Sequence, residues 1–403
     1  MPEFFIGRQP ILDRNLKLHA YELLFRSGEK NDSSGSLDDD SATSQVLITA
    51  FTEIGLEKLV GNRLAFVNLP YKFICNPDLL PMSPEQVVLE VLETVTIDQH
   101  SVEGIKKLAE LGFTIALDDF IYSSEYDAVL PYISLIKLDI TQIERDKWAE
   151  QISALRQYGC QILAEKVETE EDFQALKALE VDYYQGYFFA KPKIISGKRI
   201  SSNKLMLLQT LAKINDPNTD IDVLQDLISK DVGISVKSLN YVNSAASGLN
   251  RKVESIREAI LYLGRQTIRS WVTLFVMASV DDKPDELMSM ALVRAKFCEL
   301  VARVAELEGK DSYFTVGLFS ILDSLLDAPL EEVIESMALT GEMRDALVSH
   351  TGDKGLALRC AMDLEYGFAD GLSFRDLDEL TISDLHLEAM RWADVSMQEL
   401  GLS

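Results

Sequence analysis

The chain is moderately large and acidic, with the composition of a globular protein. It has 403 residues, of which 47% are hydrophobic and 26% charged, so about two or three domains are expected and wholesale disorder is not. Lys and Arg number 39 against 65 Asp and Glu, which gives a formal net charge of −26. Because both halves share the acidic surplus, we expect neither a nucleic acid polymer nor an anionic membrane surface as a partner.

The cysteines and the N-terminus indicate the compartment. Cys75, Cys160, Cys298 and Cys360 lie far apart, which disfavours a disulfide scaffold or a structural zinc site and fits a reducing environment. The first residues carry an acid and two prolines where a signal peptide needs a basic start and an apolar core. The chain contains no run of about 18 apolar residues, which is the length needed to span a bilayer. We therefore expect a cytoplasmic protein.

Short β-branched runs alternate with helical patterns up to about residue 195. The runs that predict strands are 4–6, 64–68, 87–92, 114–118, 135–138, 162–167 and 184–189. Apolar residues at helical spacing predict helices over 42–54, 101–111 and 170–179, and the polar segment 31–40 predicts a loop. Repeated strand–helix units indicate a parallel sheet with covering helices, either open or closed into a barrel.

The pattern changes after Pro192. From Asn203 onward apolar residues recur at helical spacing and β-rich runs largely disappear, which predicts an all-helical second half. We place the boundary within 194–202 and expect domains over 1–197 and 198–403.

Polar side chains stand within or directly after the predicted strands. They are Asn68, Glu90, Asp118, Asp119, Lys137, Asp139, Glu165, Glu168 and Gln185. Glu22 joins them from the start of an apolar stretch that begins at Tyr21 and ends in Arg26. The carboxyl ends of the strands in a parallel α/β barrel face a common mouth, where active sites are assembled. A single acid after a strand is more often a helix cap or a solvated loop residue, and Asp139 fits that interpretation.

For three of these residues, a role beyond helix capping is indicated by the apolar runs around them. Glu90 interrupts an apolar run, and Asp118 and Asp119 close another. Buried carboxylates are unfavourable unless they are paired or bind a cation, and several together repel one another, so they favour a metal ion between them. A set of oxygen ligands suits Mg²⁺ or Mn²⁺ rather than zinc. Two neighbouring aspartates can bridge two ions, which suits attack of water on a phosphodiester.

Residues 3 to about 192 resemble the EAL domain, a family of cyclic-di-GMP phosphodiesterases. The motifs that carry the resemblance are Glu22-Leu23-Leu24, Arg26, Asn68, Glu90-Val91-Leu92-Glu93, Asp118-Asp119-Phe120, Lys137-Leu138-Asp139, Ala164-Glu165-Lys166-Val167-Glu168 and Gln185-Gly186-Tyr187. The resemblance implies an α/β fold with a TIM-like (β/α) barrel, two Mg²⁺ or Mn²⁺ ions as cofactors, and cyclic-di-GMP as substrate.

The resemblance also implies a role for each matching residue. The first metal ion would be held by Glu22, Asn68, Glu90 and Asp118, and the second by Asp118, Asp119 and Glu165. The catalytic pair Lys137 and Glu165 would position or deprotonate the attacking water. Arg26 and Gln185 would bind the substrate, Arg26 through a phosphate of the dinucleotide, and Gln185 would also support the water and metal shell. Glu93 would brace the loop after Phe120.

Residues 204–280 resemble an HDOD domain, a non-catalytic relative of the HD phosphohydrolases. The matching positions are Asp231, Asn243-Ser244-Ala245, Ala259-Ile260 and Leu263-Gly264. Where the HD relatives have Gly-Leu-Leu-His-Asp, this chain has Gly317-Leu318-Phe319-Ser320-Ile321, which lacks their metal ligands. We therefore expect a non-catalytic domain, with His350 as a surface or capping residue. Together the two halves resemble the bacterial EAL–HDOD (YuxH-like) signalling proteins.

Two main hypotheses follow for function. The first is a metal-dependent phosphodiesterase that hydrolyses cyclic-di-GMP to pGpG in second-messenger signalling, with a regulatory HDOD domain. The second is a catalytically degenerate barrel that acts as a cyclic-di-GMP sensor or an interaction scaffold. Departures from the family pattern motivate it: residues 121–127 replace a glycine-containing loop, Lys166 replaces glycine, and Leu23 replaces alanine.

A sugar hydrolase with paired carboxylates is a weaker alternative, since that chemistry requires neither Asn68 nor Lys137. The resemblance implies a homodimer through the barrel, and a signalling protein as the partner of the helical half.

Overall fold

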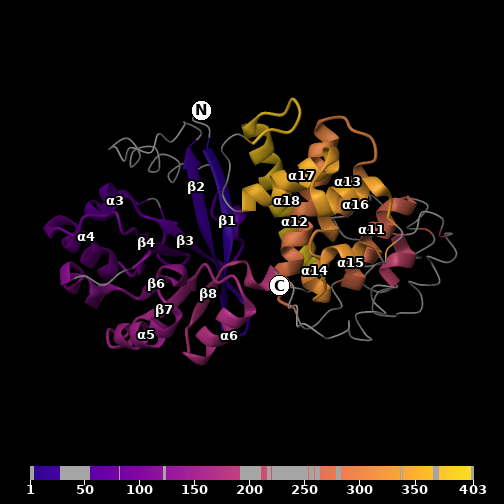
Figure 1. Cartoon of the computed structure of the whole chain (residues 1–403). Helices are drawn as coiled ribbons and strands as arrows, with labels where there is room; N and C mark the ends of the chain where they lie inside the picture. The colour runs from indigo at the N-terminus through magenta and orange to yellow at the C-terminus, as the bar shows by residue number, and fades with distance from the viewer. Residues whose placement is uncertain are drawn as a thin grey trace. The chain divides into compact units, whose positions relative to one another are not determined.

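The computed structural model describes residues 4–27, 55–80, 82–120, 124–190, 210–215, 264–277, 283–335, 339–365 and 372–400, with positions 219, 253, 258 and 337. It divides into two compact units, Met1–Phe188 with Glu365–Asp370 and Phe189–Leu364 with Gly371–Ser403 (Figure 1). The predicted helix 42–54, loop 31–40 and boundary 194–202, and most of the HDOD motif residues, lie outside the described residues. Among the helices that are described, none is long and apolar enough to cross a membrane.

The first unit is a closed barrel of eight strands in sequence order, which confirms the expected fold class. The strands are β1 (Phe4–Asp13), β2 (Leu18–Ser27), β3 (Leu64–Asn68), β4 (Val87–Val91), β5 (Thr114–Leu117), β6 (Leu135–Asp139), β7 (Gln161–Glu165) and β8 (Tyr183–Gln185). Neighbours from β2 to β8 pair in parallel. The expectation of a parallel sheet fails for β1, which runs antiparallel to both β2 and β8.

The reversal of β1 follows from the short turn that joins it to β2. The carboxylate of Asp13 accepts hydrogen bonds from the backbone N–H groups of Asn15 and Lys17, at 2.7 and 3.0 Å. Leu16 takes a left-handed conformation with φ of 60°. A connection this short can join antiparallel strands but not parallel ones, which need a crossover of a dozen or more residues. The N-terminal hairpin therefore closes the barrel.

Helices and short 3₁₀ turns connect the parallel strands. The α-helices are α2 (Glu57–Val60), α3 (Tyr71–Cys75), α4 (Gln99–Glu110), α5 (Trp148–Arg156) and α6 (Glu170–Ala178). The 3₁₀ turns are η2 (Pro77–Leu79), η3 (Ser124–Ala128), η4 (Leu130–Tyr132), η5 (Ile140–Gln142), η6 (Arg145–Lys147) and η7 (Tyr187–Ala190). At the start of α4, the Asp98 carboxylate accepts from the backbone N–H of Ser101 and the Ser101 hydroxyl accepts from that of Asp98, which fixes where the helix begins.

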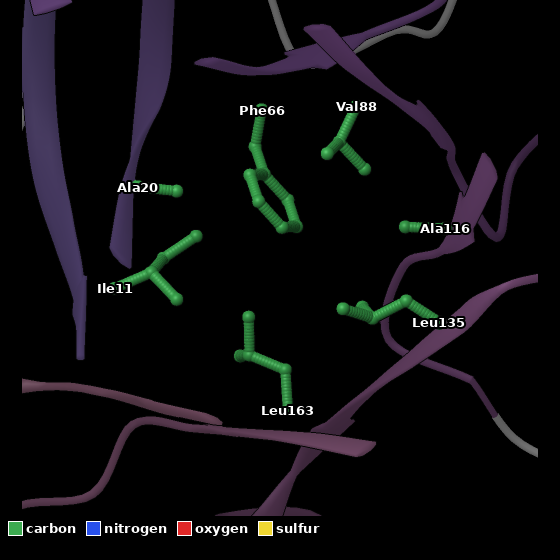
Figure 2. Packing of buried hydrophobic residues seen from close by; sticks show 7 residues of the cluster. All are labelled: Ile11, Ala20, Phe66, Val88, Ala116, Leu135 and Leu163. Carbon is green, nitrogen blue, oxygen red and sulfur yellow. The ribbon is translucent and has the colours of Figure 1, made fainter. Parts of the chain in front are cut away.

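An apolar layer fills the interior of the barrel. One residue from each of β1 to β7 contributes to it, namely Ile11, Ala20, Phe66, Val88, Ala116, Leu135 and Leu163. Figure 2 shows these side chains pointing inward from their strands, with the ring of Phe66 extending toward the middle of the group, between Ala20 and Ala116 in this view. Such inward layers are typical of TIM barrels. The barrel is therefore a packed core and not a channel.

The described part of the second unit is helical, as expected. Its helices are α11 (Arg265–Met277), α12 (Asp285–Val304), α13 (Lys310–Phe319), α14 (Leu322–Leu326), α15 (Leu330–Glu335), α16 (Gly341–Ser349), α17 (Gly352–Glu365) and α18 (Glu379–Leu400). Helix α12 is buried on nearly all sides and packs against α13 and α18. Gly317 allows α13 to approach closely, since a Cβ there would lie 2.5 Å from backbone atoms of Ala295.

Candidate active site at the barrel mouth

A polar layer lies directly beyond the apolar layer, at the carboxyl ends of the strands. Side chains in a strand alternate between its two faces, so residues two apart point the same way. In each of β2 to β7 the inward apolar residue is followed two positions later by a polar one, in the pairs Ala20/Glu22, Phe66/Asn68, Val88/Glu90, Ala116/Asp118, Leu135/Lys137 and Leu163/Glu165. The strand period therefore gathers these polar side chains at one mouth.

Lys137 lies at the centre of this layer. Its Nζ is 2.6 Å from Glu90 Oε1, 2.8 Å from Asp118 Oδ1, 2.9 Å from Glu165 Oε1 and 3.5 Å from Glu22 Oε2. The Lys137 side chain is 1% exposed and that of Glu90 is fully buried, so water screens these charges little. One ammonium cannot neutralise four carboxylates, and the site carries an excess of negative charge.

The excess charge shifts the pKa values of the buried groups. Burial alone would lower the pKa of Lys137, but the surrounding carboxylates raise it well above its ordinary value. Burial raises the pKa of Glu90 well above the ordinary value, and repulsion from Glu22 adds to the rise. Burial likewise raises the pKa of Glu165 to about 8, although Lys137 opposes the shift. The cluster therefore retains protons near neutral pH that ordinary carboxyl groups would release.

Several oxygens of the layer are buried without a hydrogen bond. Within the described part of the chain these are Asn68 Oδ1, Glu90 Oε2, Asp119 Oδ1, Glu165 Oε2 and Gln185 Oε1. Leaving a buried acceptor unpaired is unfavourable by about 1–3 kcal/mol, so such atoms usually mark a place for a ligand, an ion or water. The donor set consists of oxygens, which a hard divalent cation prefers.

The carboxylates of this layer are not spaced to chelate a metal ion in the described structure. Among the described His, Cys, Asp and Glu residues, no three are already spaced to hold a metal ion. The ammonium of Lys137 takes the centre of the carboxylates instead. The residue types therefore fit a divalent ion, and the carboxylates would have to shift from the lysine to bind one.

Gln185 connects Glu22 to the hairpin strand β1. Its Nε2 donates to Glu22 Oε2 at 2.6 Å and to Gln9 Oε1 at 3.1 Å. Gln9 was not among the residues predicted from the sequence. The available signal was that Gln9 lies two residues before Ile11, on a strand that runs opposite to the others, so it points to the same mouth. Recognising that signal required knowing that β1 is antiparallel.

A second polar group adjoins the first at Asp119. Asp119 and Lys166 both have left-handed backbones, with φ of 42° and 55°. Lys166 Nζ lies 3.9 Å from Asp119 Oδ2 and forms a hydrogen-bonded ion pair with Asp139. Burial raises the pKa of Asp119, with Lys166 opposing the rise. Asp119 therefore lies between the central cluster and the Lys166–Asp139 pair.

Asp139 acts mainly as a structural cap, as the sequence indicated. Its Oδ1 accepts from the Thr141 backbone N–H at 2.8 Å and from the Thr141 hydroxyl at 2.6 Å, at the start of η5. Gln142 Nε2 donates to its Oδ2 at 3.0 Å. Burial would raise the pKa of Asp139, but the hydrogen bonds from Lys166, Thr141 and Gln142 outweigh it and lower the pKa.

The contacts described above do not test the roles of three predicted features of the site. Glu93 is exposed in the turn after β4, and its charge acts on Asp119. Arg26 belongs to β2, but its side chain is not among those described, and neither are residues 121–123 of the altered loop. The roles of Arg26, Glu93 and this loop remain predictions.

In the helical unit, Ser320 and His350 have structural partners. Ser320 ends α13; its Oγ donates to the Gly317 carbonyl at 2.7 Å and accepts from Arg294 Nη1 at 3.1 Å. His350 ends α16 in a left-handed conformation, which confirms the capping role predicted for it.

Comparison with known proteins identifies both halves of the chain. The model of the EAL domain matches residues 78–192, and the model of the HDOD domain matches residues 202–338. The chain is 32% identical over 397 residues to "Cyclic di-GMP phosphodiesterase CdgJ" of Vibrio cholerae serotype O1 (strain ATCC 39315 / El Tor Inaba N16961), covering 96% of this chain and 92% of that one. The chain belongs to the EAL–HDOD family.

A second EAL–HDOD protein, YuxH of Bacillus subtilis (strain 168), is 32% identical over 402 residues, covering 96% of this chain and 97% of its own. Among solved structures, an EAL domain protein from Listeria monocytogenes EGD-e aligns with a TM-score of 0.37 and 21% identity, over 46% of this chain and 87% of that chain. The EAL match begins after β3, so Glu22 and Asn68 lie outside it. The barrel nonetheless brings both residues to the mouth that β4 to β8 form.

Proposed function

We propose that this EAL–HDOD protein is a phosphodiesterase that uses divalent metal ions to hydrolyse cyclic-di-GMP to pGpG at the barrel mouth. The observation that carries the proposal is the buried layer in which Glu22, Glu90, Asp118 and Glu165 surround Lys137 at the strand ends. The similarity of the whole chain to a protein named as a cyclic di-GMP phosphodiesterase supports the same substrate.

The proposed metal ligands are oxygen-bearing side chains of this layer. Glu22, Asn68, Glu90 and Asp118 would hold a first Mg²⁺ or Mn²⁺ ion, and Asp119 and Glu165 would share a second with Asp118. Bound ions of this kind supply charge neutralisation and Lewis acidity at a phosphodiester. The unpaired oxygens of Asn68, Glu90, Asp119 and Glu165 support this assignment.

Lys137 would orient the attacking water, and Glu165 would accept its proton. Because the pKa of Lys137 is held well above its ordinary value, its ammonium keeps its protons and orients water by donating hydrogen bonds. Glu165, whose Oε1 lies 2.9 Å from Lys137 Nζ, would take the proton from that water. Gln185 positions Glu22 through its 2.6 Å hydrogen bond, and Arg26 would bind a substrate phosphate.

The HDOD half would act as a non-catalytic regulatory or interaction domain that binds a signalling protein. Ser320 and Ile321 cannot replace the metal ligands of the HD relatives. We also propose domain limits of 1–197 and 198–403, which the ends of the two family matches at residues 192 and 202 support.

The test is turnover by the purified full-length chain with cyclic-di-GMP and Mn²⁺ or Mg²⁺, with pGpG quantified by chromatography. We expect Glu22→Ala to lower turnover at least about a hundredfold, since it removes a proposed ligand and one of the two hydrogen-bond acceptors of Gln185. Glu110→Ala, an exposed change on α4, should leave turnover unchanged. Absence of pGpG with both ions would contradict the proposal.

One observation favours the alternative of a cyclic-di-GMP sensor. In the described structure a lysine, and not a chelating group of acids, forms the centre of the site. Calorimetry separates the two functions: binding of cyclic-di-GMP without formation of pGpG would support the sensor.

A further inference from the structure

Lys166 is a residue whose backbone conformation and side-chain contacts both need an explanation. It follows Glu165 directly after β7 and has a φ of 55°, a left-handed conformation that lysine adopts rarely and glycine readily. Its side chain is 53% exposed, so burial of its apolar stem does not account for the conformation. The charged end of the side chain reaches two carboxylates, those of Asp119 and Asp139.

Asp139 holds the Lys166 ammonium in place. Its side chain is 4% exposed and already fixed by Thr141 and Gln142 when it pairs with Lys166. The ammonium is thereby anchored 3.9 Å from Asp119 Oδ2. Asp119 also presents a buried oxygen, Oδ1, that has no hydrogen-bond partner within the described residues. The Lys166 ammonium thus lies beside a carboxylate whose second oxygen has no hydrogen-bond partner among the described residues and is available to a metal ion.

We propose that Lys166 is an internal counter-ion that weakens binding of the second divalent ion at Asp119, so that the two ions bind with unequal affinity. The inference rests on the metal sites of the proposed function. An ammonium near one oxygen of Asp119 repels a dication on the same carboxylate and competes for its charge. The first ion would be held by Glu22, Asn68, Glu90 and Asp118, none of which forms an ion pair with Lys166 among those described. Lys137 contacts proposed ligands of both ions, Glu22 and Glu90 of the first, Glu165 of the second and the shared Asp118, so Lys166 is the charge that distinguishes the two sites.

Unequal affinity would make turnover depend on the concentration of divalent ions. At low concentration only the first ion binds, and the chain can hold cyclic-di-GMP without the second ion. At higher concentration the second ion binds and hydrolysis proceeds. Lys166 would therefore set the concentration of divalent ions above which the chain hydrolyses the cyclic-di-GMP that it binds.

The experiment is a calorimetric titration of the full-length chain with Mn²⁺, combined with electron paramagnetic resonance to count free ions. The wild type should show a tight ion and a weak ion. Lys166→Met keeps the length of the side chain and the left-handed position but removes the charge, and should tighten the second ion about tenfold. Lys166→Arg keeps the charge and should retain the weak second site.

Lys147→Met is the matched control, because Lys147 is similarly exposed, at 57%, and pairs with Glu144 instead. It should leave both affinities as in the wild type. Equal isotherms for the wild type and Lys166→Met, or two equally tight ions in the wild type, would overturn the inference while leaving the phosphodiesterase proposal intact. Failure of both proteins to bind any Mn²⁺ would overturn both proposals, and circular dichroism checks that each variant is folded.

Discussion

The central feature at the scale of single residues is a lysine surrounded by acids in a nearly dry site. Removing charges from water is unfavourable, and it is compensated here only in part, since Lys137 faces Glu22, Glu90, Asp118 and Glu165 together. The remaining repulsion is relieved when a carboxyl group keeps a proton or when a further cation binds. Protons and metal ions should therefore compete for the same oxygens.

This competition makes the stability of the metal-free chain depend on pH. Folding raises the pKa of Glu165 from 4.5 to about 8, so the folded chain binds this proton more tightly than the unfolded chain does. The resulting stabilisation is complete below about pH 4.5 and is lost as pH rises through about 8. We expect the free energy of unfolding in EDTA to fall as pH rises across this window.

Urea denaturation at several pH values measures this dependence. Glu165→Gln, which carries no titrating proton, should show a shallower fall, whereas Glu150→Gln on the exposed side of α5 should follow the wild type. Parallel profiles for Glu165→Gln and the wild type would show that the proton resides elsewhere in the cluster.

At the scale of elements, the strand period explains how much of the site the sequence could predict. An inward apolar residue is followed two positions later by a polar one in β3 to β7. We expected the polar residues at the strand ends to lie close together, and the ion pairs of Lys137 with Glu90, Asp118 and Glu165 agree with that expectation. The hairpin was harder to predict. Strand β1 contains Arg8, Gln9 and Pro10, which interrupt any strand pattern, so its length, its direction and the position of Gln9 were missed.

The left-handed conformations also escaped prediction. Nothing in the local sequence indicates that Asp119 and Lys166 adopt positive φ, because such a conformation depends on the path that the backbone takes after each strand. Only the comparison of Lys166 with the family glycine gave a hint of it.

Packing between α3 and α4 gives a prediction at this scale. A Cβ at Gly104 would lie 1.9 Å from the Ile74 carbonyl oxygen, so Gly104→Ala forces the two helices apart. Overpacking of this kind costs about 1–3 kcal/mol, which exceeds the gain of about 1 kcal/mol from alanine as a helix former. We expect a net loss of stability by urea denaturation. Gly341→Ala, where nothing lies within 4 Å, should be neutral or slightly stabilising.

At the scale of the whole molecule, the chain consists of two compact units with separate cores. One core lies inside the barrel, and the other surrounds α12. Units with their own cores can unfold separately, and a ligand stabilises only the unit that binds it. The proposed metal ligands all belong to the barrel, so metal ions should act on one unit alone.

Calorimetric melting of the full chain should therefore show two transitions. Gly104→Ala should lower the transition of the barrel, and Gly317→Ala, whose Cβ would lie 2.5 Å from backbone atoms of Ala295, should lower that of the helical unit. Mn²⁺ at a hundred times its Kd adds about 2.7 kcal/mol to the unit that binds it, which raises the Tm of the barrel by roughly 5–10 °C. Glu22→Ala should abolish this shift. If Mn²⁺ instead raises the transition that Gly317→Ala lowers, the metal ions bind the helical unit and the barrel mouth is not their site.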